Sequence, residues 1–143
     1  MSVESVLLPV FVEVTLIFVL MFVMGRARLG AIGAGETRID DIALGQQNWP
    51  ERALKAANAF NNQFQIPVLF YVLVILALYT RKADLIFVVM SWIFVISRIL
   101  HAGIHGTTNY VPHRFGAYFV GVVVLLIMWI IFALRILLNA PIL

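Results

Sequence analysis

Three groups of polar side chains recur at helical spacing inside otherwise apolar sequence. Residues three, four and seven positions apart share one face of a helix, so each group can present its side chains together. The groups are Asn58, Asn62 and Gln65; Arg98, His101 and His105; and Arg114 with Tyr118. Arginine and amide groups on facing helices, with few acids near them, suit an anionic ligand that also forms hydrogen bonds. The spacing therefore predicts a binding site for such a ligand.

The chain that must position these groups has the composition of a membrane protein. Of its 143 residues, 63% are hydrophobic and 12% are charged, and the mean hydropathy is +1.02. A soluble domain carries about 25% charged residues. The sequence contains no cysteine, which excludes a disulfide framework. These values exclude a water-soluble globular domain and a disordered chain.

Four apolar stretches divide the chain into membrane spans. We place them at residues 5–25, 50–79, 83–105 and 114–138 of one domain, residues 1–143. Each stretch is long enough for a helix to cross a hydrocarbon core of about 30 Å. None shows the two-residue alternation of a barrel strand. The expected fold is all-α, an integral membrane four-helix bundle.

The second span is expected to carry polar side chains into the membrane. Its apolar part, residues 66–79, gives only about 21 Å of helix, so the helix must begin earlier, near Trp49. Asn48 is positioned to cap this helix, and Glu51 lies where a capping box needs an acid. Amides at membrane depth face protein or water. One subunit has little interior to hide them, so we expect a homotrimer with second helices lining its axis or interfaces.

The distribution of basic residues predicts the orientation of the four spans. The first and third loops and the helix ends beside them carry Arg26, Arg28, Arg38, Arg52, Lys55, Arg98 and Arg114. The opposite side carries only Arg81, Lys82 and Arg135. Basic loops stay in the cytoplasm. We therefore expect a multi-pass protein of the cell inner membrane with both termini outside the cytoplasm, in contact with membrane lipids.

The roles of several polar residues in the spans have more than one interpretation. Arginines at helix ends often only reach toward lipid headgroups, but Arg98 lies one turn inside His101, where an ionisable residue is a functional candidate. His101 and His105 have zinc-ligand spacing without the glutamate of the HExxH motif, so we expect no metal. Glu13, in the middle of the first span, fits proton transfer, an ion pair with a neighbouring helix, or a protonated packing residue. No soluble basic segment suggests nucleic-acid binding.

The third and fourth spans carry a pattern that resembles a known family. The pattern is Arg98-x2-His101-x3-His105-x8-Arg114-x3-Tyr118, with Asn62-x2-Gln65 shortly before Pro67 upstream. It resembles the MAPEG family, the membrane-associated proteins in eicosanoid and glutathione metabolism. The second span, with the sequence FQIPVLFY at residues 64–71, is most similar to bacterial members.

The resemblance implies a homotrimer that binds glutathione, as a co-substrate, between subunits near the cytosolic side. Arg114 matches the family arginine that lies near the glutathione sulfur and stabilises its thiolate. Tyr118 matches an aromatic ligand contact one turn further on. The other positions that match residues around the ligand are Arg28, Asn62, Arg98, His101 and His105.

Two departures from the family pattern affect the expected ligand. Asn58 and Gln65 stand where the family usually has an arginine and a glutamate. Each lost charge-assisted contact removes ~1.5–3 kcal/mol, which together is roughly a hundredfold or more in affinity. The resemblance implies conjugation or reduction of lipophilic electrophiles with glutathione or a similar thiol. The alternatives are a non-enzymatic lipid-binding protein on the same fold and a small transporter that moves protons through Glu13 and the histidines.

Overall fold

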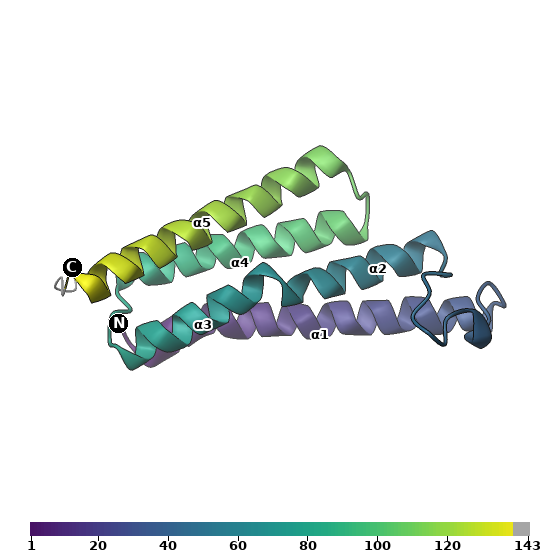
Figure 1. Cartoon of the computed structure of the whole chain (residues 1–143), viewed down its shortest axis with the longest axis horizontal. Helices are drawn as coiled ribbons and strands as arrows, with labels where there is room; N and C mark the ends of the chain where they lie inside the picture. Colours follow the sequence, from purple (N-terminus) through teal and green to yellow (C-terminus); the bar gives the residue numbers. More distant parts are fainter. Residues whose placement is uncertain (139–143) are drawn as a thin grey trace.

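The computed structural model describes residues 1–138. It contains four long helical segments, the second of which consists of α2 and α3 in succession (Figure 1). Within this range there is no strand, and all four segments are long and apolar enough to cross a membrane. The expectation of an all-α protein with four spans is therefore confirmed. The last five residues of the expected domain, 139–143, lie outside the described range. The α-helices are α1 (Val3–Gly33), α2 (Glu51–Asn61), α3 (Ile66–Tyr79), α4 (Leu85–Gly106) and α5 (Val111–Leu137).

The first helix is longer than the span expected at residues 5–25. α1 begins after Ser2, whose hydroxyl accepts a hydrogen bond from the Ser5 backbone N–H, and continues to Gly33. Its 31 residues give about 46 Å of helix, more than a hydrocarbon core of about 30 Å. Arg26 and Arg28 therefore lie inside the helix rather than after it. The connection to α2, residues 34–50, is therefore shorter than the sequence predicted, and it contains a 3-10 turn, η1 (Ile39–Asp41).

The expected continuous helix from Trp49 to Tyr79 is wrong. α2 ends at Asn61, and a 3-10 turn, η2 (Asn62–Phe64), separates it from α3. Pro67 explains the break, because proline has no N–H to donate and its ring clashes with the carbonyl four residues earlier.

The expected capping box at the start of this span is also absent. The side chain of Asn48 donates to the carbonyl of Asp41, 2.7 Å away, and does not cap α2. Glu51 pairs with Lys55 one turn along the helix. The helix N-cap is Pro50, whose side chain has no capping oxygen. The loop before α2 therefore uses Asn48 to hold its own fold together.

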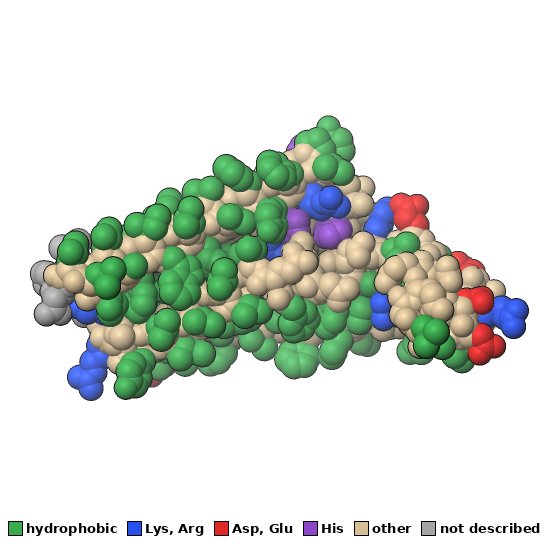
Figure 2. Space-filling view, viewed as in Figure 1, with side chains coloured by type: hydrophobic (Ala, Val, Ile, Leu, Met, Phe, Trp, Pro, Cys, Tyr) green, Lys and Arg blue, Asp and Glu red, His purple; other side chains and the backbone are tan. Residues whose placement is uncertain are grey.

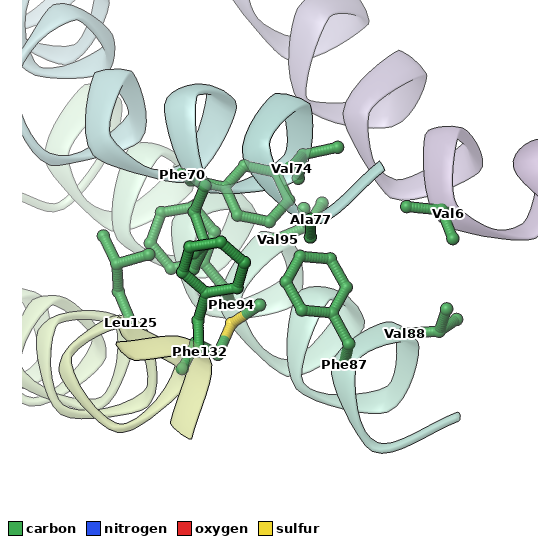
Figure 3. Close-up of a cluster of buried hydrophobic side chains, with 12 residues drawn as sticks. Val6, Phe70, Val74, Ala77, Phe87, Val88, Phe94, Val95, Leu125 and Phe132 are labelled. Carbon is green, nitrogen blue, oxygen red and sulfur yellow. The ribbon is translucent and has the colours of Figure 1, made fainter. Parts of the chain in front are cut away.

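The apolar core lies in the half of the bundle that contains both ends of the described chain (Figures 1 and 3). Side chains from α1, α3, α4 and α5 contribute to it. Its buried members are Val6, Phe70, Leu73, Val74, Ala77, Phe87, Val88, Phe94, Val95, Leu125, Met128 and Phe132. In the other half, α2 buries only small side chains, Ala53, Ala56, Ala57 and Ala59. These small side chains let α2 pack closely against α1 and α4.

A buried ion pair, absent from the sequence expectations, joins the start of α4 to the end of α5. The Asp84 carboxylate lies 2.6 Å from Arg135 and accepts a hydrogen bond of 2.9 Å from the Phe87 backbone N–H. Asp84 is 3% exposed. Burial alone would raise the pKa of Asp84, but the bonds from Arg135 and Phe87 and the charge of Arg135 hold it below its ordinary value. The pair holds α4 and α5 together at the ends farthest from the loop that joins them.

Candidate functional site

A polar pocket opens between α4 and α5 beside η2, and its volume is about 240 Å³. Figure 2 shows histidine and basic side chains gathered here, within a surface that is otherwise largely hydrophobic along the helices. The site therefore combines polar groups with an apolar surrounding surface. The lining residues are Asn62, His101, His105, Val111, Arg114, Phe115 and Tyr118.

His101 joins three of the elements that form the pocket. Its Nδ1 lies 3.0 Å from the backbone carbonyl of Arg114, and its Nε2 lies 2.5 Å from the side-chain nitrogen of Asn62. A carbonyl oxygen only accepts, so Nδ1 carries the hydrogen, and Nε2 then accepts from the Asn62 amide. The imidazole is therefore held in one neutral tautomer. This arrangement fixes η2, α4 and α5 relative to one another at the pocket wall.

Two buried polar atoms at the pocket have no hydrogen-bond partner within residues 1–138. They are Oδ1 of Asn62 and Nδ1 of His105. The Asn62 amide already donates to His101, so its oxygen is the group that is left to accept from a ligand. The His105 ring stands edge-on to His101, with centroids 5.6 Å apart. Buried polar atoms are normally paired, and these two indicate where a polar ligand would bind.

Arg114 supplies the positive charge of the pocket. Its Nη1 donates to the side-chain oxygen of Asn109, 2.5 Å away, and that partner is neutral. Arg114 forms no ion pair with a carboxylate within the described part of the chain. Asn109 has a φ of +52°, a left-handed conformation that asparagine tolerates better than most residues. The turn before α5 therefore orients the guanidinium without neutralising it.

Arg98 lies beneath the pocket and does not line it. Its side chain is 0% exposed, and its Nη2 makes a long contact of 3.5 Å to the backbone carbonyl of Asn62. The guanidinium carbon lies 5.7 Å from the centroid of the Tyr118 ring. The same ring lies 5.5 Å from His101. Arg98 therefore supports the pocket wall from below at Asn62 and Tyr118.

Close packing of α5 on α4 positions these groups. A side-chain carbon added at Gly121 would lie 2.6 Å from the hydroxyl oxygen of Ser97 and 3.7 Å from Cδ of Arg98. A side chain at position 121 would therefore force the Ser97 hydroxyl to move for the two helices to stay this close. The sequence gives a weak sign of this close packing, since Gly121 and Ser97 are small residues in long apolar helices.

Besides Arg98, three of the expected site residues do not line the pocket. Arg28 stacks over Trp49, with 4.9 Å between its guanidinium carbon and the ring centroid. Asn58 and Gln65 are exposed and do not line the pocket. Buried in this stretch instead is Gln63, which donates to the carbonyl of Ala59. The 3-10 turn η2 lies between Asn58 and Gln65, so their seven-residue spacing is not that of one continuous α-helix.

The four spans and the polar pocket describe a multi-pass membrane protein whose site lies between helices near one end of the bundle. A model of the MAPEG family matches residues 6–134, and the chain belongs to this family. The resemblance recognised in the pattern from Arg98 to Tyr118 is thereby confirmed. Neither the curated proteins nor the solved structures include a match to the chain.

Proposed function

We propose that this protein conjugates or reduces lipophilic electrophiles with glutathione or a similar thiol, at the cytoplasmic side of the membrane. The observation that carries the proposal is the pocket in which Arg114 is not neutralised and two buried polar atoms stand free for a ligand. Its ligand-binding residues are Asn62, His105, Arg114 and Tyr118, with His101 and Arg98 holding the wall. Membership of the MAPEG family supports the choice of glutathione as co-substrate.

Arg114 is the proposed catalytic residue. A cation beside a thiol favours the thiolate, which is the nucleophilic form. An arginine stays protonated throughout, so Arg114 stabilises the thiolate without taking its proton. The charge acts strongly here because the pocket lies among apolar helices, where water screens poorly. The thiol proton passes to water. The thiolate sulfur would then form a bond to an electrophilic atom of a substrate that enters from the bilayer, and the displaced bonding pair leaves with the leaving group or, in an addition, takes up a proton from water.

A second candidate function is lipid binding without catalysis. An apolar groove of about 490 Å³ runs between α3 and α5, formed by Ile66, Leu69, Val122, Leu125, Leu126 and Trp129. It has the size and surface to hold part of an acyl chain. Saturable lipid affinity without turnover of any electrophile would favour this function over the enzymatic one.

The assembly we propose is a homotrimer in which neighbouring subunits cover the second span. Asn58, Asn61 and Gln65 are exposed on the second span, which η2 interrupts and which is long and apolar enough to cross a membrane. Amides facing lipid are costly, so a protein surface must cover them. A second subunit would satisfy these amides and could bring Asn58, Gln65 or Arg28 to its neighbour's pocket. Native mass spectrometry in mild detergent tests this assembly, and a monomeric mass would contradict it.

The orientation we propose has both termini outside the cytoplasm, in a cell inner membrane. The first and third loops, with the ends of α1, α2, α4 and α5 beside them, carry most of the basic residues. Both ends of the described chain lie at the opposite end of the bundle (Figure 1). A C-terminal reporter fusion should be active only outside the cytoplasm. Cytoplasmic activity would reverse the orientation.

The function is tested by glutathione titration and conjugation kinetics on purified wild type and two Arg114 variants. Arg114→Ala should cut turnover strongly while thiol affinity falls less, because the contact strengthens as charge develops on sulfur. Arg114→Lys should restore activity only in part, since lysine lacks the planar fork. Arg26→Ala is the matched control, because Arg26 is exposed on α1 outside this pocket. Full activity in Arg114→Ala would contradict the proposed function.

A further inference from the structure

Glu13 is buried in the middle of the membrane-spanning part of α1. Its side chain is 0% exposed, and neither carboxylate oxygen has a hydrogen-bond partner within residues 1–138. A carboxylate in an apolar interior is costly unless another group compensates its charge. The pocket is not lined by Glu13, and the proposed chemistry does not use it.

Arg98 presents the complementary problem on α4. It is also 0% exposed, and its Nε and Nη1 have no hydrogen-bond partner in the described range. Its one hydrogen bond there is the long contact from Nη2 to the carbonyl of Asn62. Arginine does not lose its proton in proteins, so its charge must be balanced by an anion.

The two groups belong to helices that pack against each other. α1 contacts α4 along the bundle, and the charges of Glu13 and Arg98 attract one another. Tyr71 on α3 interacts with both charges, and its hydroxyl is likewise buried with no partner in residues 1–138. Three buried polar groups on three packed helices therefore interact electrostatically, although no ion pair or hydrogen bond joins Glu13 to Arg98 or Tyr71 within residues 1–138, and Glu13 is the carboxylic acid among them.

We propose that Glu13 is the counter-ion of Arg98 and positions it beneath the pocket. The guanidinium that Glu13 balances reaches the carbonyl of Asn62 and the ring of Tyr118, both of which line the pocket. The pair leaves Arg114 as the cation that is free to act on a bound anion. Glu13 is thus a positioning residue that acts through Arg98, and not a proton carrier.

The stability of four proteins tests the ion pair: wild type, Glu13→Gln, Arg98→Met and the double variant. Glu13→Gln leaves a permanent buried cation, so its melting temperature should fall by on the order of 10 °C. Arg98→Met should fall less, because a lone carboxyl can take up a proton and become neutral. The double variant should melt well above Glu13→Gln, since it contains neither charge. A protonated packing acid predicts instead that Glu13→Gln melts like wild type, and that result would overturn the proposal.

A matched control uses the other buried acid of the bundle. Asp84 lies about 21 Å from Arg98 along α4, at 1.5 Å per residue, so Asp84→Asn and Arg98→Met should have additive effects. If Glu13→Gln alone cannot be purified, the double variant decides the question. A double variant that folds supports the pairing of Glu13 with Arg98, and a double variant that does not fold contradicts this pairing.

Glutathione affinity tests whether Glu13 acts through Arg98, and this part rests on the proposed function. Arg98→Met and Glu13→Gln should each bind glutathione about tenfold more weakly, an effect of one lost hydrogen-bonded contact. The double variant should bind no more weakly than Arg98→Met alone. A further loss in the double variant would show a separate role for Glu13. If wild type does not bind glutathione, the proposed function fails, whereas the stability comparison still tests the ion pair.

Discussion

At the scale of single residues, Asn62 connects the support of the pocket to its ligand surface. Its backbone carbonyl accepts a long hydrogen bond from Arg98, and its side-chain nitrogen donates to His101. Its side-chain oxygen has no hydrogen-bond partner within residues 1–138. Because the amide nitrogen is committed to His101, the orientation of the free oxygen is fixed. The residue therefore supplies one acceptor at a defined place, which suits an ammonium, amide or thiol donor of a ligand.

Replacement of Asn62 by leucine should weaken ligand binding while the fold persists. The variant removes the donor to His101 and the free acceptor, and we expect glutathione affinity to fall about tenfold or more. The control is Gln47→Ala, an exposed residue of the loop before α2. Isothermal titration on both variants provides the measurement. Equal affinity of Asn62→Leu and wild type would remove Asn62 from the site.

At the scale of elements, the crossing of α4 and α5 sets the width of the pocket. Gly121→Ala should destabilise the protein by about 1–3 kcal/mol, because the added carbon collides with Ser97. Gly116→Ala on the same helix has open space around the added carbon and should be neutral or stabilising. Thermal unfolding in detergent compares the two. Equal melting temperatures would show that the crossing tolerates a side chain.

The opposite ends of the same two helices should give the bundle a defined sensitivity to acid. The pKa of Asp84 is lowered in the folded protein, so its contribution to stability is complete above the ordinary aspartate value of about 3.9. The contribution is lost as the pH falls below that value and through the lowered folded pKa. Asp84→Asn should lower the melting temperature at pH 7 by leaving Arg135 buried without its partner.

The same variant should also change the response to acid. Melting temperature should depend less on pH below about 4 in Asp84→Asn than in wild type. The control is Asp40→Asn, which alters an exposed acid of the first loop. The role of the ion pair would be contradicted if the melting temperature still fell steeply with acid in Asp84→Asn while this fall disappeared in Asp40→Asn.

Spacing along the sequence predicts which side chains share a helix face only where the helix is unbroken. The spacing from Arg98 to His105 lies within one unbroken helix, which places His101 and His105 at one pocket with Arg98 beside it; that these residues bind a ligand stays a prediction. The 3-10 turn η2 interrupts the second span between Asn58 and Gln65, so the constant helical phase assumed for these two residues does not hold across it, and their part in ligand binding stays a prediction. The pairing of Glu13 with Arg98 depends on how α1 is rotated against α4, which spacing within one helix does not determine.

At the scale of the whole molecule, the exposed amides of the second span connect binding to assembly. Gln65 does not line the pocket of the chain that carries it, so a direct contact between Gln65 and a ligand requires the neighbouring copy of the proposed trimer. If the proposed trimer brings Gln65 to the adjacent pocket, Gln65→Glu should tighten glutathione binding by adding a charge pair with the ligand amine.

The test of that prediction is glutathione titration of Gln65→Glu at low and high salt. The gain in affinity should shrink with salt where water reaches the contact. Gln47→Glu adds the same charge on the first loop and serves as the control for a general change in potential. Equal effects of the two variants would place Gln65 outside any glutathione site in the assembly.

The central claim is that Arg114 holds a bound thiol as its thiolate. Difference absorbance in the ultraviolet measures this directly, because thiolate absorbs where thiol does not. Addition of glutathione to wild type at neutral pH should give a saturable thiolate signal, and Arg114→Ala should bind glutathione with little or none of that signal. A thiolate signal of equal size in Arg114→Ala, or glutathione binding to wild type without any thiolate, would contradict the claim.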